Sequence, residues 1–263
     1  MKIIDAHAHI FPTKIADKAS KSIGDFYEMD MDSDASLESL LKKEEEINSE
    51  YTLVCSSALS PKQVVSINDF ISSKVKENGK LIGFAAMHKD LEEYKEEIKR
   101  AKSLGLVGVK FHNDMQRFDI DDPKMYPIYQ AISDEGMAVL FHMGDDRYDF
   151  SAPEKMIRVA QDFPKMTVIG AHFGGYRRWM DAINNPCLDN VYYDTSSSLF
   201  MLDKATAVRF IDHFGPDRFF FGSDFPMWSP KGELKRFMSL DLDEDVQRMI
   251  LYDNFAKVFG LNG

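Results

Sequence analysis

Short apolar runs alternate with longer segments of helical periodicity from one end of this chain to the other. The apolar runs predict strands at 2–6, 51–56, 81–87, 106–111, 137–141, 166–171, 190–193 and 218–222. The periodic segments between them predict helices at 37–48, 61–77, 91–104, 123–135, 153–162 and 205–214. Proline near the start and glycine beyond the end of several segments support these helix boundaries.

The alternation of strand and helix predicts an α/β fold in which parallel strands close into a (β/α)8 TIM barrel. The strands are almost continuously apolar, as expected of a sheet that is covered on both faces. An open, doubly wound sheet is the alternative, but it would normally carry a glycine-rich turn after the first strand. Here the first strand leads into His7-Ala8-His9 instead, which favours the barrel.

Two segments fall outside the repeated strand–helix unit. Residues 10–35 are predicted to form an irregular insertion after the first strand, long enough to act as a rim or a lid. Residues 243–260 are predicted to form extra C-terminal helices. Because 263 residues is the length of one such barrel, we expect a single domain over 1–263.

Charge and composition restrict the classes of partner and the location that we expect for the protein. A formal net charge of -11 disfavours nucleic acid and anionic membranes, and it leaves a small molecule as the expected substrate. No apolar run approaches the ~18 residues of a membrane span. Met1 leads directly into the first strand without room for a signal peptide, and Cys55 and Cys187 do not make a disulfide framework. We therefore expect a cytoplasmic protein.

Five of the apolar runs end in a histidine or an aspartate. The residues concerned are His7, His9, His112, His142, His172 and Asp224. Because a barrel of parallel strands places its chemistry at the C-terminal ends of its strands, we expect these side chains to serve one site. A single strand-end histidine could be an accident, but this repetition predicts a metal-dependent enzyme.

The residue types suit one divalent metal ion. His7 and His9 are two positions apart in an extended segment, so their side chains point to the same face. His142 would add a third imidazole, and Asp224 would add a carboxylate oxygen. We expect zinc, with manganese and iron as alternatives whose ligand preferences overlap. His172 then serves as the general acid or base, and Asp224 can also take a proton from metal-activated water.

Four ordered motifs spread over residues 5 to 226 carry a family resemblance: Asp5-Ala6-His7-Ala8-His9, Phe141-His142, Ala171-His172-Phe173-Gly174-Gly175 and Gly222-Ser223-Asp224-Phe225-Pro226. In these motifs the chain resembles the amidohydrolase superfamily, and within it the branch of aminocarboxymuconate semialdehyde decarboxylase and related aromatic-acid decarboxylases. The resemblance implies a barrel with one divalent metal ion on His7, His9, His142 and Asp224, and with His172 as the catalytic acid/base. It also implies that a homodimer can form.

Basic and aromatic residues near these motifs are candidates for binding the substrate. Lys110 and His112 share one face of the predicted fourth strand, where we expect contact with a carboxylate or a carbonyl group. Arg177 and Arg178 offer guanidinium groups that suit carboxylates, and Trp228 could form a wall of an apolar pocket. In the two-metal branches of the superfamily, a carboxylated lysine of the fourth strand bridges the ions. Lys110 makes that arrangement an alternative.

We expect hydrolysis of a C–O or C–N bond in a small carboxylate-bearing substrate. The first alternative is non-oxidative decarboxylation of an unsaturated or aromatic carboxylic acid, which is a C–C lyase reaction. A metal-dependent deoxyribonuclease is a second alternative, but the run Val109-Lys110-Phe111-His112 offers no glutamate at the end of the fourth strand. A barrel without catalytic activity is disfavoured because every expected ligand and His172 are present.

Overall fold

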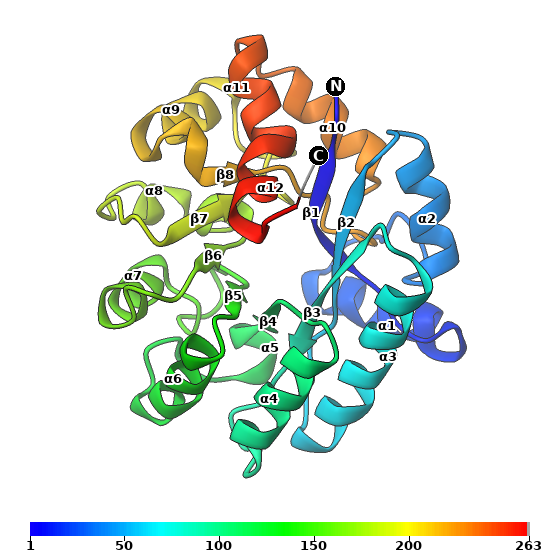
Figure 1. Ribbon diagram of the computed structural model, residues 1–263. Coiled ribbons are helices and arrows are strands. Elements are labelled where there is room, and N and C mark those ends of the chain that lie inside the picture. Colours follow the sequence, from blue (N-terminus) through cyan, green and yellow to red (C-terminus); the bar gives the residue numbers. More distant parts are fainter. Residues whose placement is uncertain (262–263) are drawn as a thin grey trace. The chain divides into compact units, whose positions relative to one another are not determined.

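The computed structural model in Figure 1 describes residues 1–261. The chain forms two compact units. The first unit contains Met1–Val54 and the chain from Asp194 onward, and the second contains Cys55–Tyr193. No helix within residues 1–261 has both the length and the apolar character needed to cross a membrane.

The strands follow one another in a single eight-stranded sheet, in the order β1-β2-β3-β4-β5-β6-β7-β8. Consecutive parallel strands joined by helices are the topology of a (β/α)8 barrel, which confirms the predicted fold class. The strands are β1 (Ile4–His9), β2 (Tyr51–Cys55), β3 (Leu81–Ala86), β4 (Gly108–Phe111), β5 (Ala138–Phe141), β6 (Val168–Gly170), β7 (Val191–Asp194) and β8 (Phe219–Phe220).

Helices follow the strands along the chain. They are α1 (Thr13–Tyr27), α2 (Leu37–Glu45), α3 (Val64–Glu77), α4 (Tyr94–Ser103), α5 (Asn113–Gln116), α6 (Tyr126–Asp134), α7 (Pro153–Asp162), α8 (Trp179–Ala182), α9 (Lys204–Phe214), α10 (Pro230–Met238), α11 (Glu244–Arg248) and α12 (Asn254–Phe259). A π-helical segment, Met249–Asp253, joins α11 to α12, so the predicted C-terminal helices are present.

In the first unit, the first and last strands lie side by side. The backbone N–H of Ala6 on β1 donates to the carbonyl of Phe221, just after β8, at 2.8 Å. Ala8 and Phe225 form a further parallel bridge in the same direction. The C-terminal helices pack on this pair of strands, with the rings of Phe220 and Phe255 5.3 Å apart. This pairing brings the ends of β1 and β8, and the residues after them, together.

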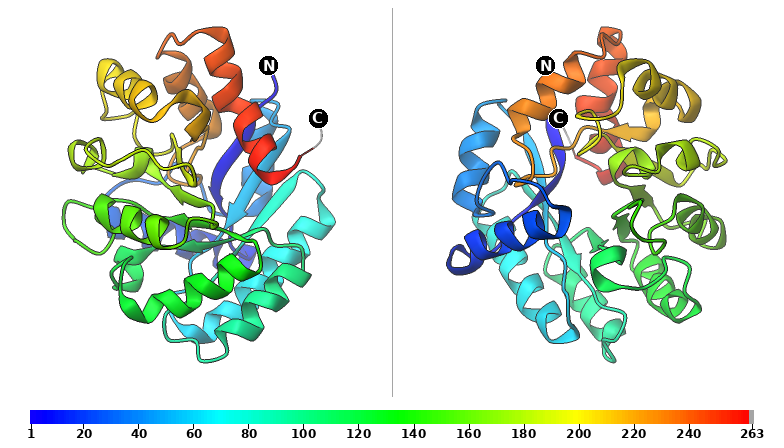
Figure 2. Two further views of the ribbon diagram at one scale, coloured as in Figure 1. Left: turned by 60° about the vertical axis from the view of Figure 1, so that its left-hand side comes forward. Right: turned by 180° about the vertical axis from the view of Figure 1, so that it is seen from behind.

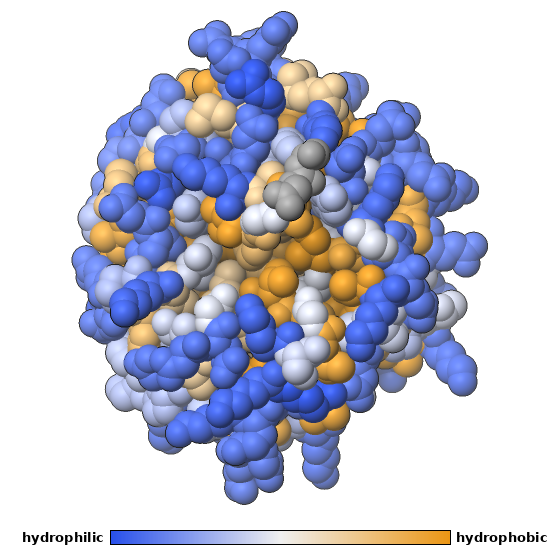
Figure 3. All heavy atoms as spheres, in the orientation of Figure 1, coloured by the Kyte–Doolittle hydropathy of each residue, from blue (hydrophilic) through white to orange (hydrophobic). Residues whose placement is uncertain are grey.

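In the second unit, strands β3 to β7 form parallel pairs in one continuous register, with Phe111 opposite Phe141. Helices α3, α4, α6 and α7 lie along the outer side of these strands (Figures 1 and 2). Tyr129 of α6 packs its ring edge-on against both Phe111 and Phe141, and its hydroxyl donates to the carbonyl of Ile120 at 2.8 Å. Hydrophilic residues cover the outer surfaces of α3 and α4 (Figure 3).

The structure corrects the prediction of an irregular segment at residues 10–35. This segment contains the helix α1, whose buried positions are Ala16, Ser20, Gly24 and Tyr27. They recur at the spacing of one helix face, but three of them are small, so the apolar signal of that face is weak.

Candidate metal centre

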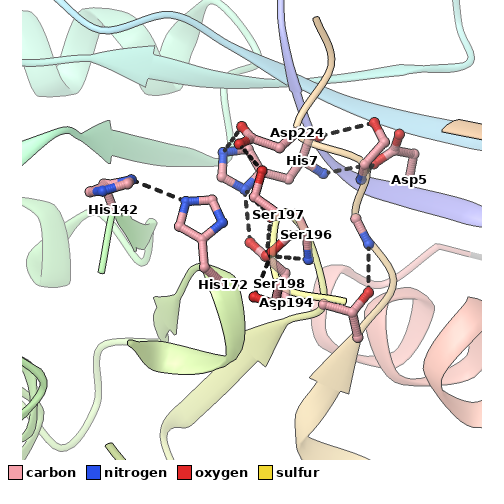
Figure 4. A network of polar contacts seen from close by, with 12 residues as sticks. Asp5, His7, His142, His172, Asp194, Ser196, Ser197, Ser198 and Asp224 are labelled. Carbon is pink, nitrogen blue, oxygen red and sulfur yellow. Dashed lines mark hydrogen bonds and ion pairs between the residues drawn. The ribbon is translucent and has the colours of Figure 1, made fainter. Parts of the chain in front are cut away.

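The first unit brings His7, His9 and Asp224 together, as the sequence predicts. The two histidines lie on β1, and Asp224 follows β8, the neighbouring strand. The Nε2 atoms of His7 and His9 are 3.2 Å apart. Asp224 Oδ1 lies 3.6 Å from Nε2 of His7 and 3.3 Å from Nε2 of His9. Three atoms that can all bind a cation therefore converge within a small triangle, and Figure 4 labels two of the residues, His7 and Asp224.

These distances fit the donor set of a metal ion. Donor atoms 2.0–2.1 Å from a common tetrahedral ion lie about 3.3–3.4 Å from one another. The three measured separations, 3.2, 3.3 and 3.6 Å, are centred on that value. Two imidazole nitrogens and one carboxylate oxygen are also ligands that zinc, manganese and iron accept. The residues of the first unit thus fit a divalent metal ion.

Asp194 at the end of β7 fixes the orientation of the His7 ring. Its Oδ2 lies 2.9 Å from Nδ1 of His7, and both side chains are fully buried. Ser196 Oγ donates to Asp194 Oδ1 at 2.5 Å and lies 3.2 Å from the same ring nitrogen. A carboxylate on Nδ1 keeps the proton there, which leaves the lone pair of Nε2 for the ion. This arrangement of carboxylate, histidine and metal is common in metalloenzymes.

Asp5 on β1 links the backbone of β1 to the segment that follows β8. Its Oδ1 accepts from the backbone N–H groups of His7, at 3.0 Å, and Ser223, at 2.9 Å. Burial raises the pKa of Asp5 to about 6, and burial together with the nearby Asp5 raises the pKa of Glu44 well above its usual value. Asp5 thus orients the backbone on either side of the centre.

Asp224 has a further partner in Ser197. The Ser197 hydroxyl donates to Asp224 Oδ2 at 2.5 Å, and the indole N–H of Trp228 donates to the Ser197 oxygen at 3.1 Å. The Trp228 ring also packs at a tilt against the ring of Phe200, with 4.8 Å between their centroids, and the Arg236 guanidinium lies 4.4 Å from the centre of the Trp228 ring. The indole N–H of Trp228 therefore supports the metal centre through Ser197, independently of any contact between the ring face and a substrate.

The second unit brings together His112, His142 and His172. Nδ1 of His142, which follows β5, lies 3.0 Å from Nε2 of His172, which follows β6 (Figure 4). The His112 ring stacks on the His142 ring at 4.0 Å, with an angle of 10° between their planes. Asp114 Oδ2 lies 3.6 Å from Nε2 of His142 and accepts from the Ser151 hydroxyl at 2.5 Å. Burial raises the pKa of Asp114 to about 6.

A shared cation on His112, Asp114 and His142 is disfavoured, although their ligand atoms lie within 4.8 Å of one another. Imidazole binds metal through a lone pair in the ring plane. Because the two rings are nearly parallel and 4.0 Å apart, one ion cannot lie in both planes. His112 is instead the N-cap of α5, where its side chain accepts from the backbone N–H of Met115.

The predicted substrate-binding residues of the second unit differ in their surroundings. Lys110 on β4 is only 1% exposed, and His112 is also buried. Arg178 donates to Asp149 at 2.8 Å and to Asp181 at 2.9 Å, so its guanidinium already binds two carboxylates of the protein. Arg177 lies over the ring of Tyr176, and its guanidinium is 3.9 Å from a carboxylate oxygen of Asp146. Of the two arginines, Arg177 is therefore the better candidate for an anionic substrate.

Sequence reasoning missed four residues of these clusters: Asp194, Ser196, Ser197 and Asp114. The signal for the first three was an apolar run, Val191-Tyr192-Tyr193, followed directly by Asp194-Thr195-Ser196-Ser197. This pattern of an apolar run followed by polar residues is the same as at the other strand ends, but it contains no histidine. Asp114 lies two residues beyond His112 in the short helix α5, where strand periodicity no longer applies.

Backbone conformations with positive φ are found in each of the two clusters. His172 has φ of 61°, Asp224 of 60° and Ser197 of 46°. Such conformations are uncommon for residues other than glycine, and they persist only where the surrounding structure holds them in place. They re-aim the chain directly after β6, β7 and β8, where the polar side chains gather.

The sequence pattern that defines the amidohydrolase family matches residues 4–261 of this chain. No curated protein matches the sequence. Among solved structures, 5-carboxyvanillate decarboxylase from Sphingomonas paucimobilis is similar, with 16% identity, 99% of each chain covered and a TM-score of 0.75.

Two further structures show the range of similar proteins. A dihydroxybenzoic acid decarboxylase from Polaromonas sp. JS666 with bound manganese has 16% identity, covers 100% of this chain and 98% of its own, and gives a TM-score of 0.74. A probable 2-pyrone-4,6-dicarboxylic acid hydrolase from Acinetobacter baumannii has 17% identity, covers 99% of this chain and 100% of its own, and gives a TM-score of 0.73. At these identities the likeness shows a common fold.

Proposed function

Because this chain is an enzyme of the amidohydrolase family, we propose that it uses one divalent metal ion to act on a small carboxylate-bearing molecule. The observation that carries the proposal is the convergence of His7 Nε2, His9 Nε2 and Asp224 Oδ1, with His7 oriented by Asp194. We propose His142 as a further ligand because it follows the strand β5 along the chain, as Asp224 follows β8. This proposal for His142 rests on its position in the sequence at the end of an apolar run.

The side chains of this centre would hold the ion without rearranging. Asp194 keeps the Nδ1 proton of His7, Ser197 occupies Oδ2 of Asp224, and Asp5 holds the backbone of β1 against that of Ser223. Groups fixed in this way pay little ordering entropy when the ion binds. A bound divalent ion polarises a substrate oxygen and lowers the pKa of water from 15.7 to about 7. Zinc is the proposed ion, and manganese is the alternative because a structural neighbour contains it.

His172 is the proposed proton carrier of the reaction. Its ring is buried, and its Nε2 lies 3.0 Å from Nδ1 of His142. An imidazole changes its charge near neutral pH, so it can either accept a proton from a nucleophile or donate one to a leaving group. His112 and Lys110, both buried at the end of β4, and Arg177 are the proposed contacts to the carboxylate of the substrate.

Hydrolysis of a C–O or C–N bond is the proposed reaction. In this hydrolysis, a base removes a proton from the water that attacks the substrate, and His172 donates a proton to the leaving group.

Decarboxylation of an unsaturated or aromatic acid is the second candidate, and one observation favours it. Asp224 Oδ2 already accepts a hydrogen bond from the Ser197 hydroxyl, which makes this carboxylate a poorer base for water. Decarboxylation needs a proton donor for the carbon that loses CO2, and it does not need a base for water. The decarboxylases among the similar structures also support this candidate.

Metal analysis of the purified protein, reloaded with zinc or manganese, tests the proposal. We expect about one equivalent per chain, lost in His9→Ala and retained in His213→Ala, whose histidine is exposed on α9. A wild-type protein that binds no metal would refute the proposed centre, and two equivalents would favour the carboxylated Lys110. A screen of lactones, amides and aromatic acids, followed by product and CO2 detection, then separates the two reactions.

A further inference from the structure

Ser197 lies between two residues of the first unit that sequence analysis selected for separate roles. Its side chain is 1% exposed. Its Oγ is 2.5 Å from Asp224 Oδ2 and 3.1 Å from the indole nitrogen of Trp228 (Figure 4 labels Ser197 and Asp224). The three side chains thus form one connected hydrogen-bond path.

The direction of this path is fixed by chemistry. An indole N–H can only donate, so the Ser197 oxygen must accept from Trp228. The single hydroxyl proton of Ser197 is then directed elsewhere, and Asp224 Oδ2 at 2.5 Å and the sulfur of Met227 at 3.5 Å are within reach. A carboxylate is the far stronger acceptor, so the proton lies on the path to Asp224.

This hydrogen bond leaves the two carboxylate oxygens of Asp224 in different situations. Oδ2 is held by Ser197, whereas Oδ1 faces Nε2 of His9 at 3.3 Å and Nε2 of His7 at 3.6 Å. We propose that Ser197 is a positioning residue, which holds Asp224 so that one oxygen alone is directed to the metal centre. The inference rests on the metal centre of the proposed function.

The backbone of Ser197 supports this role. Its φ of 46° lies in the left-handed region, where serine is uncommon and glycine is not strained. Strained residues of this kind cluster at functional sites, where the structure maintains them in spite of their cost. Its neighbour Ser198 makes a useful contrast, since the Ser198 hydroxyl donates to the backbone carbonyl of Ser196 at 2.9 Å. Both hydroxyls are buried, but that of Ser197 donates to a proposed ligand whereas that of Ser198 donates to the backbone.

The variant Ser197→Gly removes the hydroxyl without straining the backbone, so it tests the role of the hydroxyl apart from the stability of the fold. Glycine adopts a φ of 46° without strain, so we expect a melting temperature at or above that of the wild type. Loss of the hydrogen bond to Asp224 should nevertheless weaken zinc and manganese binding by about 10–100-fold, as with other residues that orient a metal ligand. Ser197→Ala is the second variant, with the same loss of affinity, and Ser198→Ala is the matched control, with unchanged affinity.

The measurements are chelator-competition titrations with each metal and thermal unfolding of the metal-free proteins. Weaker binding by both Ser197 variants, with Ser198→Ala equal to the wild type, supports the inference. Equal affinity in Ser197→Gly, Ser197→Ala and the wild type overturns the inference and leaves the proposed function standing. A wild-type protein that binds neither metal overturns both.

Discussion

Asp194 Oδ2 and His7 Nδ1 lie 2.9 Å apart, in side chains that are both fully buried. The pair joins the end of β7 to β1, and it determines which nitrogen of His7 carries the proton. Because an imidazole with its proton on Nδ1 presents a lone pair on Nε2, this contact prepares His7 as a ligand before any ion arrives.

Asp194→Asn should therefore weaken metal binding. The amide can offer its N–H group to Nδ1 of His7, which would shift the ring proton to Nε2 and block the lone pair. We expect a loss of about 10–100-fold in affinity for zinc or manganese, measured by competition with a chelator. Asp212→Asn, which changes an exposed carboxylate on α9, is the control. Unchanged affinity in Asp194→Asn would show that His7 does not depend on this contact.

His172→Asn should separate proton transfer from metal binding. A positioned acid or base typically contributes about 10²–10⁴-fold to the rate, so kcat should fall by that factor with the metal content retained. Metal content and kcat are measured on the same preparation, with the substrate found in the screen. His213→Asn should leave both values unchanged because this histidine is exposed on α9. Full turnover by His172→Asn would remove His172 from the mechanism.

The stability of the protein should fall as the pH rises from about 5 to 8. Burial raises the pKa of Glu233 from 4.5 to about 8. The folded state therefore binds a proton that the unfolded chain has already released in this range. Stability from this group is fully present below pH 4.5 and is lost as the pH rises through 8. For this one proton, the free energy of unfolding falls by at most about 1.4 kcal/mol per pH unit.

Glu233→Gln provides the test of that pH dependence. Denaturant unfolding at pH 5 and pH 8 should show a smaller difference between the two pH values in the variant than in the wild type. Glu244→Gln is the control because Glu244 is exposed in α11. The same pH dependence in Glu233→Gln and the wild type would assign the effect to other groups.

Gly108→Ala should destabilise the second unit. An added Cβ on the first residue of β4 would lie 2.4 Å from the Phe84 ring, closer than any real contact. Because neighbouring strands fix both residues, we expect a loss of about 1–3 kcal/mol in the free energy of unfolding. Gly79→Ala is the matched control, since its Cβ would meet no atom within 4 Å. Equal stability of the two variants would mean that the ring of Phe84 can move aside.

The barrel and the histidine pair could be predicted from local patterns. Each strand of the barrel is a short apolar run, and the spacing of His7 and His9 places both on one face of a strand. Asp194 escaped prediction because its role depends on a partner 187 positions away, which no local period encodes. Helix α1 escaped because its buried face is made of small residues, whose burial leaves little hydrophobic signal.

The pairing of β1 with β8 has a consequence for the order in which the protein matures. At about 5–20 residues per second, a ribosome adds Asp194 roughly 10–40 s after His7, and Asp224 follows later still. During that interval the two histidines have neither carboxylate to orient them or complete their donor set. Capture of the ion should therefore be a late step of biosynthesis, coupled to the arrival of the last strand beside the first.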